Sequence, residues 1–246
     1  MLPASARMAL GSPAAHAWRH RLTLARPRGR RAALLVAVLV GLILVGWGAG
    51  ELIRSLHAAD LRAVRDVATH RGPVDTAIAR VLSRVGSSLV IGPLVLVGCA
   101  VAYRVAGAAP AAFIAVSTAG AVAIFNLDKL LVARPRPPVD HLEAASHSSF
   151  PSGHATLSAA FYVALVIVFA SRSRARARTA AVLSAAVLLV AGIAASRVYL
   201  GVHYPTDVGA GLLLGAAWTV VAARSFRISA AGPRARPAQA ARESTP

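Results

Sequence analysis

Six long apolar runs without a single charged residue constrain this chain more than any other feature. They cover residues 32–50, 85–103, 105–127, 155–171, 179–196 and 208–223, with lengths between 16 and 23 residues. A helix needs about 20 apolar residues, and at least about 17, to cross the ~30 Å hydrocarbon core of a bilayer. Only 15% of the chain is charged, so too little polar surface remains to cover six such helices in water. The sequence predicts an all-α, polytopic membrane protein with six transmembrane helices.

The sixth run, 208–223, is shorter than a bilayer-spanning helix should be. Arg224 can extend it at one end, because a long basic side chain reaches the interface with its charge in water. At the other end, residues 203–207 can continue the helix into a polar cavity. We therefore count this run as a membrane helix.

The position of the basic residues fixes the expected orientation. If the N-terminus is cytoplasmic and the helices alternate, the inner segments carry 17 basic residues and one acidic residue, while the outer segments carry ten and eight. This asymmetry is what the positive-inside rule expects, and it accounts for the net charge of +18. The basic tails hold no aromatic stacking platform, so no nucleic-acid partner is predicted. We predict a multi-pass protein of the plasma membrane with both termini in the cytoplasm.

Three regions follow from this layout. Residues 1–31 and 225–246 are rich in Pro, Ala and Arg and are predicted to be disordered, basic cytoplasmic tails. Residues 32–224 form the six-helix domain, with 32–50 as a retained signal anchor. Two Gly-x3-Gly patterns, at Gly46 and Gly211, allow helices to pack closely within one chain or between protomers, which leaves a homo-oligomer open. A single cysteine excludes a disulfide framework.

The outer segment 51–84 separates the first two apolar runs. Its apolar residues recur at helical spacing, and Gly72-Pro73 breaks the pattern in the middle. We predict two short interfacial helices, with Asp60 and Asp75 as their caps. They form either a structural cover or a lid that faces the substrate.

Polar residues gather in the two remaining outer segments, in three short patterns. Lys129 is followed after six residues by Arg136-Pro137, and 151–154 read Pro-Ser-Gly-His. Ser196-Arg197 is followed after five residues by His203, and after three more by Asp207. Together these patterns closely resemble the three motifs of the type 2 phosphatidic acid phosphatase superfamily, and the six-helix layout from about 32 to 224 resembles that family too. The resemblance implies an active site at the non-cytoplasmic ends of the third, fourth and sixth membrane helices.

The same residues suit the chemistry of a phosphate group. Lys129, Arg136 and Arg197 supply three cations to the phosphate oxygens. Ser152 and Gly153 stand where a helix begins, and exposed N–H groups and the helix dipole favour an anion there. For Ser152 the alternative is a plain helix cap.

The two histidines follow the same logic. His203 and Asp207 are four residues apart, so the aspartate can orient the imidazole if the sixth helix starts near Pro205. The resemblance implies that His203 attacks phosphorus to form a phosphohistidine. It also implies that His154 protonates the leaving oxygen and then activates water. Arg134 either contacts the substrate or forms a salt bridge.

These expectations combine into an integral-membrane, metal-independent phosphatase that hydrolyses a lipid phosphate or diphosphate. Candidate substrates include undecaprenyl diphosphate, phosphatidic acid and phosphatidylglycerophosphate. No cofactor and no metal are predicted, since Asp140 and Glu143 lack ligand geometry and three cations already supply positive charge. The alternatives are a lipid-linked phosphotransferase that uses the same site and a non-catalytic membrane protein with a relict site. Vanadate-binding haloperoxidases share the motifs, but they are soluble, so six membrane helices argue against that activity.

Overall fold

The computed structural model describes residues 22–24, 29–145, 148–226 and 228–230, and it confirms the all-α fold and the six predicted spans. The membrane helices are α1 (Arg30–Ile53), α4 (Ser88–Ala106), α5 (Ala108–Val132), α6 (Gly153–Arg172), α7 (Arg176–Tyr199) and α8 (Pro205–Ser225). The short sixth run gains its length as predicted, because α8 begins at Pro205 and ends beyond Arg224.

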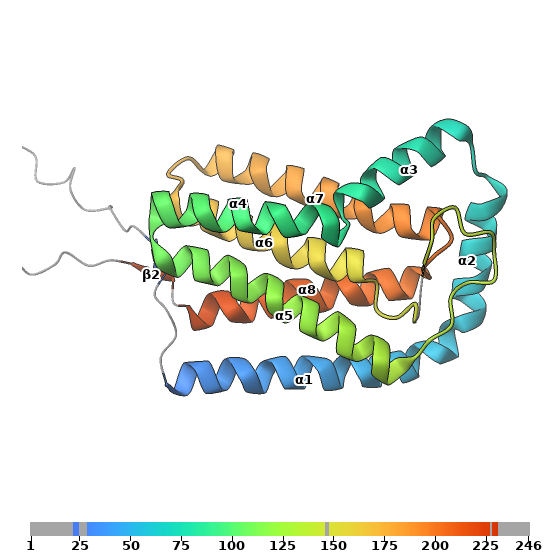
Figure 1. The fold of residues 1–246 in the computed structure, drawn as a ribbon, viewed down its shortest axis with the longest axis horizontal. Helices are drawn as coiled ribbons and strands as arrows, with labels where there is room; N and C mark the ends of the chain where they lie inside the picture. The colour runs from blue at the N-terminus through green and yellow to red at the C-terminus, as the bar shows by residue number, and fades with distance from the viewer. Residues whose placement is uncertain (1–21, 25–28, 146–147, 227, 231–246) are drawn as a thin grey trace, which may run out of the picture.

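The six helices lie side by side in one bundle, as Figure 1 shows. α6 packs most extensively against α8 and also contacts α5, α7 and α4. About half of the spanning portions of α6 and α8 is buried, whereas α1 and α4 are mostly exposed. Large apolar side chains cover the exposed faces of the outer helices, including Leu44 on α1, Leu96 on α4 and Leu188 on α7. A bilayer would cover these faces, and water could not do so favourably.

The buried core joins α5, α6 and α8. Phe113, Ile124 and Phe161 are each at most 2% exposed, and Trp218 of α8 inserts against α5. The indole N–H of Trp218 donates to the carbonyl of Ser117 at 3.0 Å, which satisfies its one polar atom within the bundle. Gly120 makes room for this ring, because a Cβ there would lie 2.2 Å from the indole.

Both Gly-x3-Gly patterns mediate close packing inside the chain. Gly46 and Gly50 of α1 lie against Asp128 and Val132 of α5. Gly211 and Gly215 of α8 lie against α6, and a Cβ on Gly215 would stand 2.3 Å from the carbonyl oxygen of Thr156. The glycines are therefore used by helix pairs of one protomer, and a homo-oligomer stays a prediction that rests on no other feature.

The outer segment forms the 3₁₀ turn η3 (Arg54–Leu56) and two helices, α2 (His57–Thr69) and α3 (Pro73–Val85), broken at Gly72 as predicted. The prediction that Asp60 and Asp75 cap these helices is wrong. The N-caps are Leu56 and Gly72, and neither helix start has a side-chain capping hydrogen bond. Asp60 turns instead toward the bundle, where a buried cation binds it.

Two short strands lie at the end of the bundle opposite α2 (Figure 1). β1 (Leu22–Leu24) pairs antiparallel with β2 (Ile228–Ala230). Both segments were predicted to belong to disordered tails, so this pairing, which brings the two flanks of the membrane domain together, is a difference from the prediction. The remaining tail residues, 1–21, 25–28, 227 and 231–246, lie outside the described residues.

Candidate active site

The first motif lies where α5 ends and the chain turns toward α6. Ala133 adopts the left-handed conformation (φ 47°) that commonly ends a helix, and Pro135 and Pro137 prevent the helix from resuming. Lys129 is thus in the last turn of α5, while Arg136 follows in the loop. Both cations donate to the carbonyl oxygen of Ser148, Lys129 Nζ at 2.6 Å and Arg136 Nη2 at 3.4 Å. The six-residue spacing therefore brings two cations to one point.

The second motif forms the start of α6. Ser152 is the N-cap residue, and its backbone N–H donates to the backbone carbonyl of Asp207 at 3.0 Å, which ties the beginnings of α6 and α8 together. Its hydroxyl makes no cap bond. Ser152 Oγ is buried and has no hydrogen-bond partner among the described residues. The plain-cap alternative for Ser152 therefore does not describe this side chain.

The third motif begins within α7, because that helix continues to Tyr199 and carries Arg197 in its last turn. The fifth membrane helix thus contributes to the site together with the third, fourth and sixth. Beyond it, the chain folds back at Gly201, which has a φ of +79°, a conformation that favours glycine. The N–H groups of Val202 and His203 both donate to the carbonyl of Arg197 at 3.3 Å. This turn explains why five residues separate Arg197 from His203.

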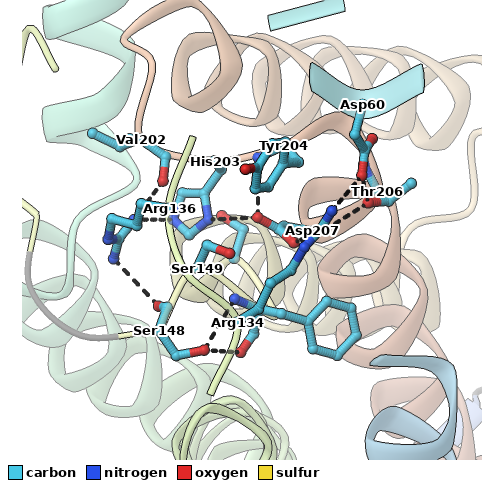
Figure 2. Close-up of polar contacts among 12 residues, drawn as sticks. Asp60, Arg134, Arg136, Ser148, Ser149, Val202, His203, Tyr204, Thr206 and Asp207 are labelled. Atoms are coloured by element: carbon cyan, nitrogen blue, oxygen red, sulfur yellow. Dashed lines mark hydrogen bonds and ion pairs between the residues drawn. The ribbon is translucent and has the colours of Figure 1, made fainter. Parts of the chain in front are cut away.

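His203 and Asp207 lie on the same side of the α8 N-terminus, as their spacing predicts. His203 Nδ1 is 3.6 Å from Asp207 Oδ2, an ion-pair distance that is longer than a hydrogen bond. Asp207 Oδ2 also accepts a hydrogen bond from the backbone N–H of Tyr204 at 3.0 Å. The other imidazole nitrogen, Nε2, is 3.4 Å from Nη1 of Arg136 (Figure 2).

Burial controls the charge of His203, which is only 2% exposed. Desolvation lowers the pKa of His203 to about 4; the nearby Asp207 opposes this shift, and the cations Arg136 and Lys129 add to it. The imidazole is therefore neutral near pH 7, with a free electron pair on one nitrogen. A neutral imidazole beside fixed cations can act as a nucleophile toward an anionic group.

One cavity of about 300 Å³ collects most of the predicted site residues. Of the eight candidates, six line it: Lys129, Arg136, Gly153, His154, Arg197 and His203. Ser152 and Asp207 are adjacent to these residues but are not among those that line the cavity. Ser88 of α4 and Asn126 of α5 complete part of the rim. Residues from Ser88 to His203, 115 positions apart in the sequence, thus surround one volume of the size that small-ligand sites have.

A carboxylate that sequence reasoning set aside also reaches the site. Glu143, considered earlier only as half of a metal pair, forms an ion pair with Nη1 of Arg197. Ser83 of α3 donates to the same carboxylate oxygen at 2.8 Å. No spacing rule indicates this contact, because it depends on how the outer loop and α3 meet the end of α7.

Arg134 forms a salt bridge, the second of its two predicted roles. Its guanidinium binds Asp207 at 2.6 Å and Asp60 of α2 at 2.7 Å, and all three side chains are at most 4% exposed. Asp60 was missed as a neighbour of the site because it lies 74 positions before Arg134 in the sequence. A buried-charge argument could have found the pair only once the two segments were known to meet.

The arrangement is suited to binding a phosphate group. Three cations, a helix N-terminus and two imidazoles converge on the cavity, and preorganised positive charge stabilises a phosphoryl group during transfer. In the described part of the chain, no group of three or more His, Cys, Asp or Glu side chains is arranged to hold a metal ion.

The chain is similar to several curated proteins that are named as phosphatases. The chain is 42% identical over 100 residues to decaprenylphosphoryl-5-phosphoribose phosphatase of Mycobacterium tuberculosis, covering 38% of this chain and 49% of the relative. It is 36% identical over 113 residues to lipid A 1-phosphatase of Rhizobium johnstonii, covering 41% of each chain. The aligned part therefore spans about half the length, or less, of these curated relatives.

A solved structure has the same fold. The transmembrane PAP2-type phosphatidylglycerolphosphate phosphatase of Bacillus subtilis superposes with a TM-score of 0.67 over 75% of this chain and 93% of that one, at 23% identity. At this identity the likeness concerns the fold alone. The family model of the PAP2 superfamily matches residues 110–229, which include all three motifs. The family model, the relatives and the three motifs agree, and residues 110–229 of this chain are a domain of the PAP2 superfamily.

Proposed function

We propose that this protein is an integral-membrane phosphatase that removes a phosphate group from a lipid phosphate or diphosphate. The observation that carries the proposal is the convergence of Lys129, Arg136, His154, Arg197 and His203 on one cavity at one end of a membrane bundle. A phosphate at this depth suits a substrate whose hydrocarbon chain stays in the bilayer. The names of the relatives point to phosphates on isoprenoid and acylated lipids.

In the first step of the proposed reaction, His203 attacks the phosphorus atom. The new P–N bond forms on Nε2, which lies 3.4 Å from Nη1 of Arg136, while the P–O bond to the lipid breaks. His154 donates a proton to the departing oxygen. Lys129, Arg136 and Arg197 hold the phosphoryl oxygens throughout and offset their negative charge.

In the second step, water releases the phosphate. His154, now neutral, takes a proton from the water as its oxygen attacks phosphorus. The P–N bond breaks, inorganic phosphate leaves, and His203 is neutral again. Since Lys129, Arg136 and Arg197 supply the positive charge that a metal ion would otherwise provide, we propose that turnover needs no metal.

The site is proposed to face the non-cytoplasmic side. The basic segment between α6 and α7 lies at the end of the bundle opposite the site (Figure 1), where the positive-inside rule places the cytoplasm. Both flanks of the domain, at β1 and β2, lie at that same end.

The test is release of inorganic phosphate by purified protein in detergent, from a panel of isoprenoid and glycerolipid phosphates and diphosphates. We expect turnover of at least one lipid, no loss with EDTA, and at least a ~10³-fold loss in His203→Gln. Labelled phosphate should be trapped on wild-type protein at acidic quench and not on His203→Gln. Full activity of that variant, or strict dependence on added Mg²⁺, would contradict the proposal.

The phosphotransferase alternative is separated in the same assay. Adding a soluble alcohol should leave inorganic phosphate as the main product if water is the natural acceptor. Quantitative transfer to the alcohol, with no phosphate released in its absence, would favour the transferase. Absence of any turnover across the panel would favour the relict-site alternative.

A further inference from the structure

A chain of buried charges connects the outer helix α2 to the candidate nucleophile. Figure 2 shows the Arg134 guanidinium between two carboxylates, with Nη1 2.6 Å from Asp207 Oδ1 and Nη2 2.7 Å from Asp60 Oδ2. The Tyr204 ring lies under the guanidinium, 4.1 Å from its central carbon. Arg134 and Asp60 do not line the cavity.

Asp60 is also hydrogen-bonded to the start of α8. The backbone N–H of Thr206 donates to Asp60 Oδ1 at 3.2 Å, and the Thr206 hydroxyl donates to Asp60 Oδ2. Arg134 also donates to that hydroxyl at 2.9 Å. Because Thr206 lies in the first turn of α8, next to Asp207, α2 is bonded directly to the start of the helix that carries the candidate site.

Arg134 determines how the Asp207 carboxylate is rotated. One oxygen of Asp207 is bound by Arg134, which leaves the other to accept from Tyr204 N–H and to face His203 Nδ1. Removing Arg134 would free the first oxygen and leave two buried carboxylates without a cation between them, which is unfavourable. A planar guanidinium can bridge two carboxylates in this way, and the single ammonium of lysine cannot copy that geometry.

We propose that Arg134 and Asp60 are positioning residues, in which Arg134 holds Asp207 against His203 and Asp60 of α2 balances the charge of Arg134. In this arrangement, α2 is part of the catalytic framework, and its docking sets the basicity of the nucleophile. The inference rests on the proposed function in naming His203 the nucleophile. The competing explanation is a salt bridge that only fastens α2 to the bundle.

The proposal predicts the direction in which the pKa of His203 changes when Arg134 or Asp60 is replaced. Removing the Arg134 cation should raise the pKa of His203, because the imidazolium then meets one positive charge fewer. Removing the Asp60 carboxylate should lower it, for the opposite reason. Removing both leaves the net charge unchanged, so the pKa should return toward its wild-type value. The other charged and titratable groups around His203 stay constant in this comparison: Lys129 on α5, Arg136 in the loop, His154 on α6, Arg197 on α7 and Tyr204 and Asp207 beside it.

The experiment compares Arg134→Gln, Asp60→Asn and the double variant with wild type in detergent micelles. The pKa of His203 is read from ¹⁵N-histidine NMR, with the His203→Gln spectrum identifying the signal. We expect a rise of about one pH unit in Arg134→Gln, a fall in Asp60→Asn, and a value between them in the double variant. The same pKa in all folded variants would overturn the proposal.

Activity gives a second readout. Asp60→Asn should lower kcat about tenfold with KM nearly unchanged, because misplacing the nucleophile affects the chemical step more than binding. Asp66→Asn is the matched control, since Asp66 lies on the exposed face of the same helix. If the salt bridge only fastens α2 to the bundle, Asp60→Asn should lower the melting temperature and leave kcat and the pKa of His203 unchanged. That result would also overturn the proposal.

The design separates this inference from the proposed function. If wild type fails to hydrolyse any lipid phosphate, the function is wrong, while the NMR titration still reports whether Arg134 and Asp60 act on His203. If Arg134→Gln does not fold, Arg134→Lys keeps the charge and loses the bridge. Arg134→Lys should then reduce kcat with a smaller pKa change, and unchanged kcat would contradict the positioning role.

Discussion

The protonation state of single side chains in the cavity sets the pH range in which the proposed reaction can proceed. His203 is the clearest case, because burial keeps its imidazole neutral well below the pH at which a free histidine takes up a proton. A nucleophile must be unprotonated, so a lowered pKa widens the pH range of activity on the acid side. The structure therefore predicts a pH profile that a surface histidine would not give.

The first prediction concerns that profile. With a His203 pKa of about 4, the acid limb of kcat/KM should lie near pH 4, and kcat/KM should fall roughly tenfold per unit below it. The measurement is kcat/KM for a lipid monophosphate in micelles, corrected for ionisation of the substrate by its own titration. An acid limb near 6.5, the ordinary value for imidazole, would show that the nucleophile is not the buried His203.

Ser152 gives a second prediction at this scale. Its buried hydroxyl has no partner in the described structure, so Ser152→Ala removes an unsatisfied polar group and should leave the melting temperature equal or higher. Loss of one donor to the phosphoryl group should lower kcat/KM about 100-fold. Ser158→Ala is the control, since Ser158 is buried in α6 and has no partner either, but lies six residues further along the chain, away from the helix N-terminus that is proposed to bind phosphate. Equal activity in Ser152→Ala and wild type would mean that the Ser152 hydroxyl does not contact the phosphoryl group.

What the sequence could reveal of the site depended on local spacing. Arg136, His154 and His203 became candidates because each stands in one of the short patterns that resemble the family's motifs. Asp60 and Glu143 were not, because their partners are set by the docking of α2, α3 and the outer loop on the bundle. Contacts of this kind depend on tertiary structure, and the spacing of residues along the chain carries no record of them.

At the scale of elements, the helices were foreseen and their contacts were not. Uncharged runs of membrane length predict a spanning helix almost regardless of context, which is why all six agree with the structure. The caps predicted for α2 and α3 were wrong, because an aspartate near a helix start can bind other partners than the helix end. Asp60 binds a buried arginine, which is a stronger hydrogen-bond partner than the N–H groups of the first turn. The glycines that join helix pairs could be noticed in the sequence, but not assigned to partners.

The α6–α8 contact yields the third prediction. Gly215→Ala places a Cβ 2.3 Å from a backbone oxygen of α6, which cannot move aside, and should destabilise the fold by about 1–3 kcal/mol. Gly209→Ala, in the same helix with nothing within 4 Å, should be neutral or stabilising by up to about 1 kcal/mol. Thermal unfolding of the two variants in the same detergent compares them. Equal melting temperatures would mean that α6 and α8 do not approach as closely as described.

At the scale of the whole molecule, the distribution of basic residues between the two ends of the bundle indicates its orientation in the membrane. α2 and the ends of α5 and α7 that line the cavity lie at one end, whereas residues 172–178, which carry four arginines around the α6–α7 turn, lie at the other (Figure 1). Such a segment is hard to translocate across a membrane, so it anchors the orientation of every helix. We therefore propose that the end that holds the cavity faces the opposite side, where it would meet lipids of the outer leaflet.

The last prediction tests this orientation with two matched cysteines. In a Cys99→Ser background, which removes the one native thiol, Ala63→Cys marks the exposed face of α2 and Ala177→Cys marks the basic segment at the start of α7. Neither alanine carries charge, so the topology signal is preserved. A membrane-impermeant maleimide should label Ala63→Cys in intact cells and Ala177→Cys only after permeabilisation. Because six helices fix the parity of every segment, the reverse labelling pattern would place the cavity in the cytoplasm and its substrates in the inner leaflet.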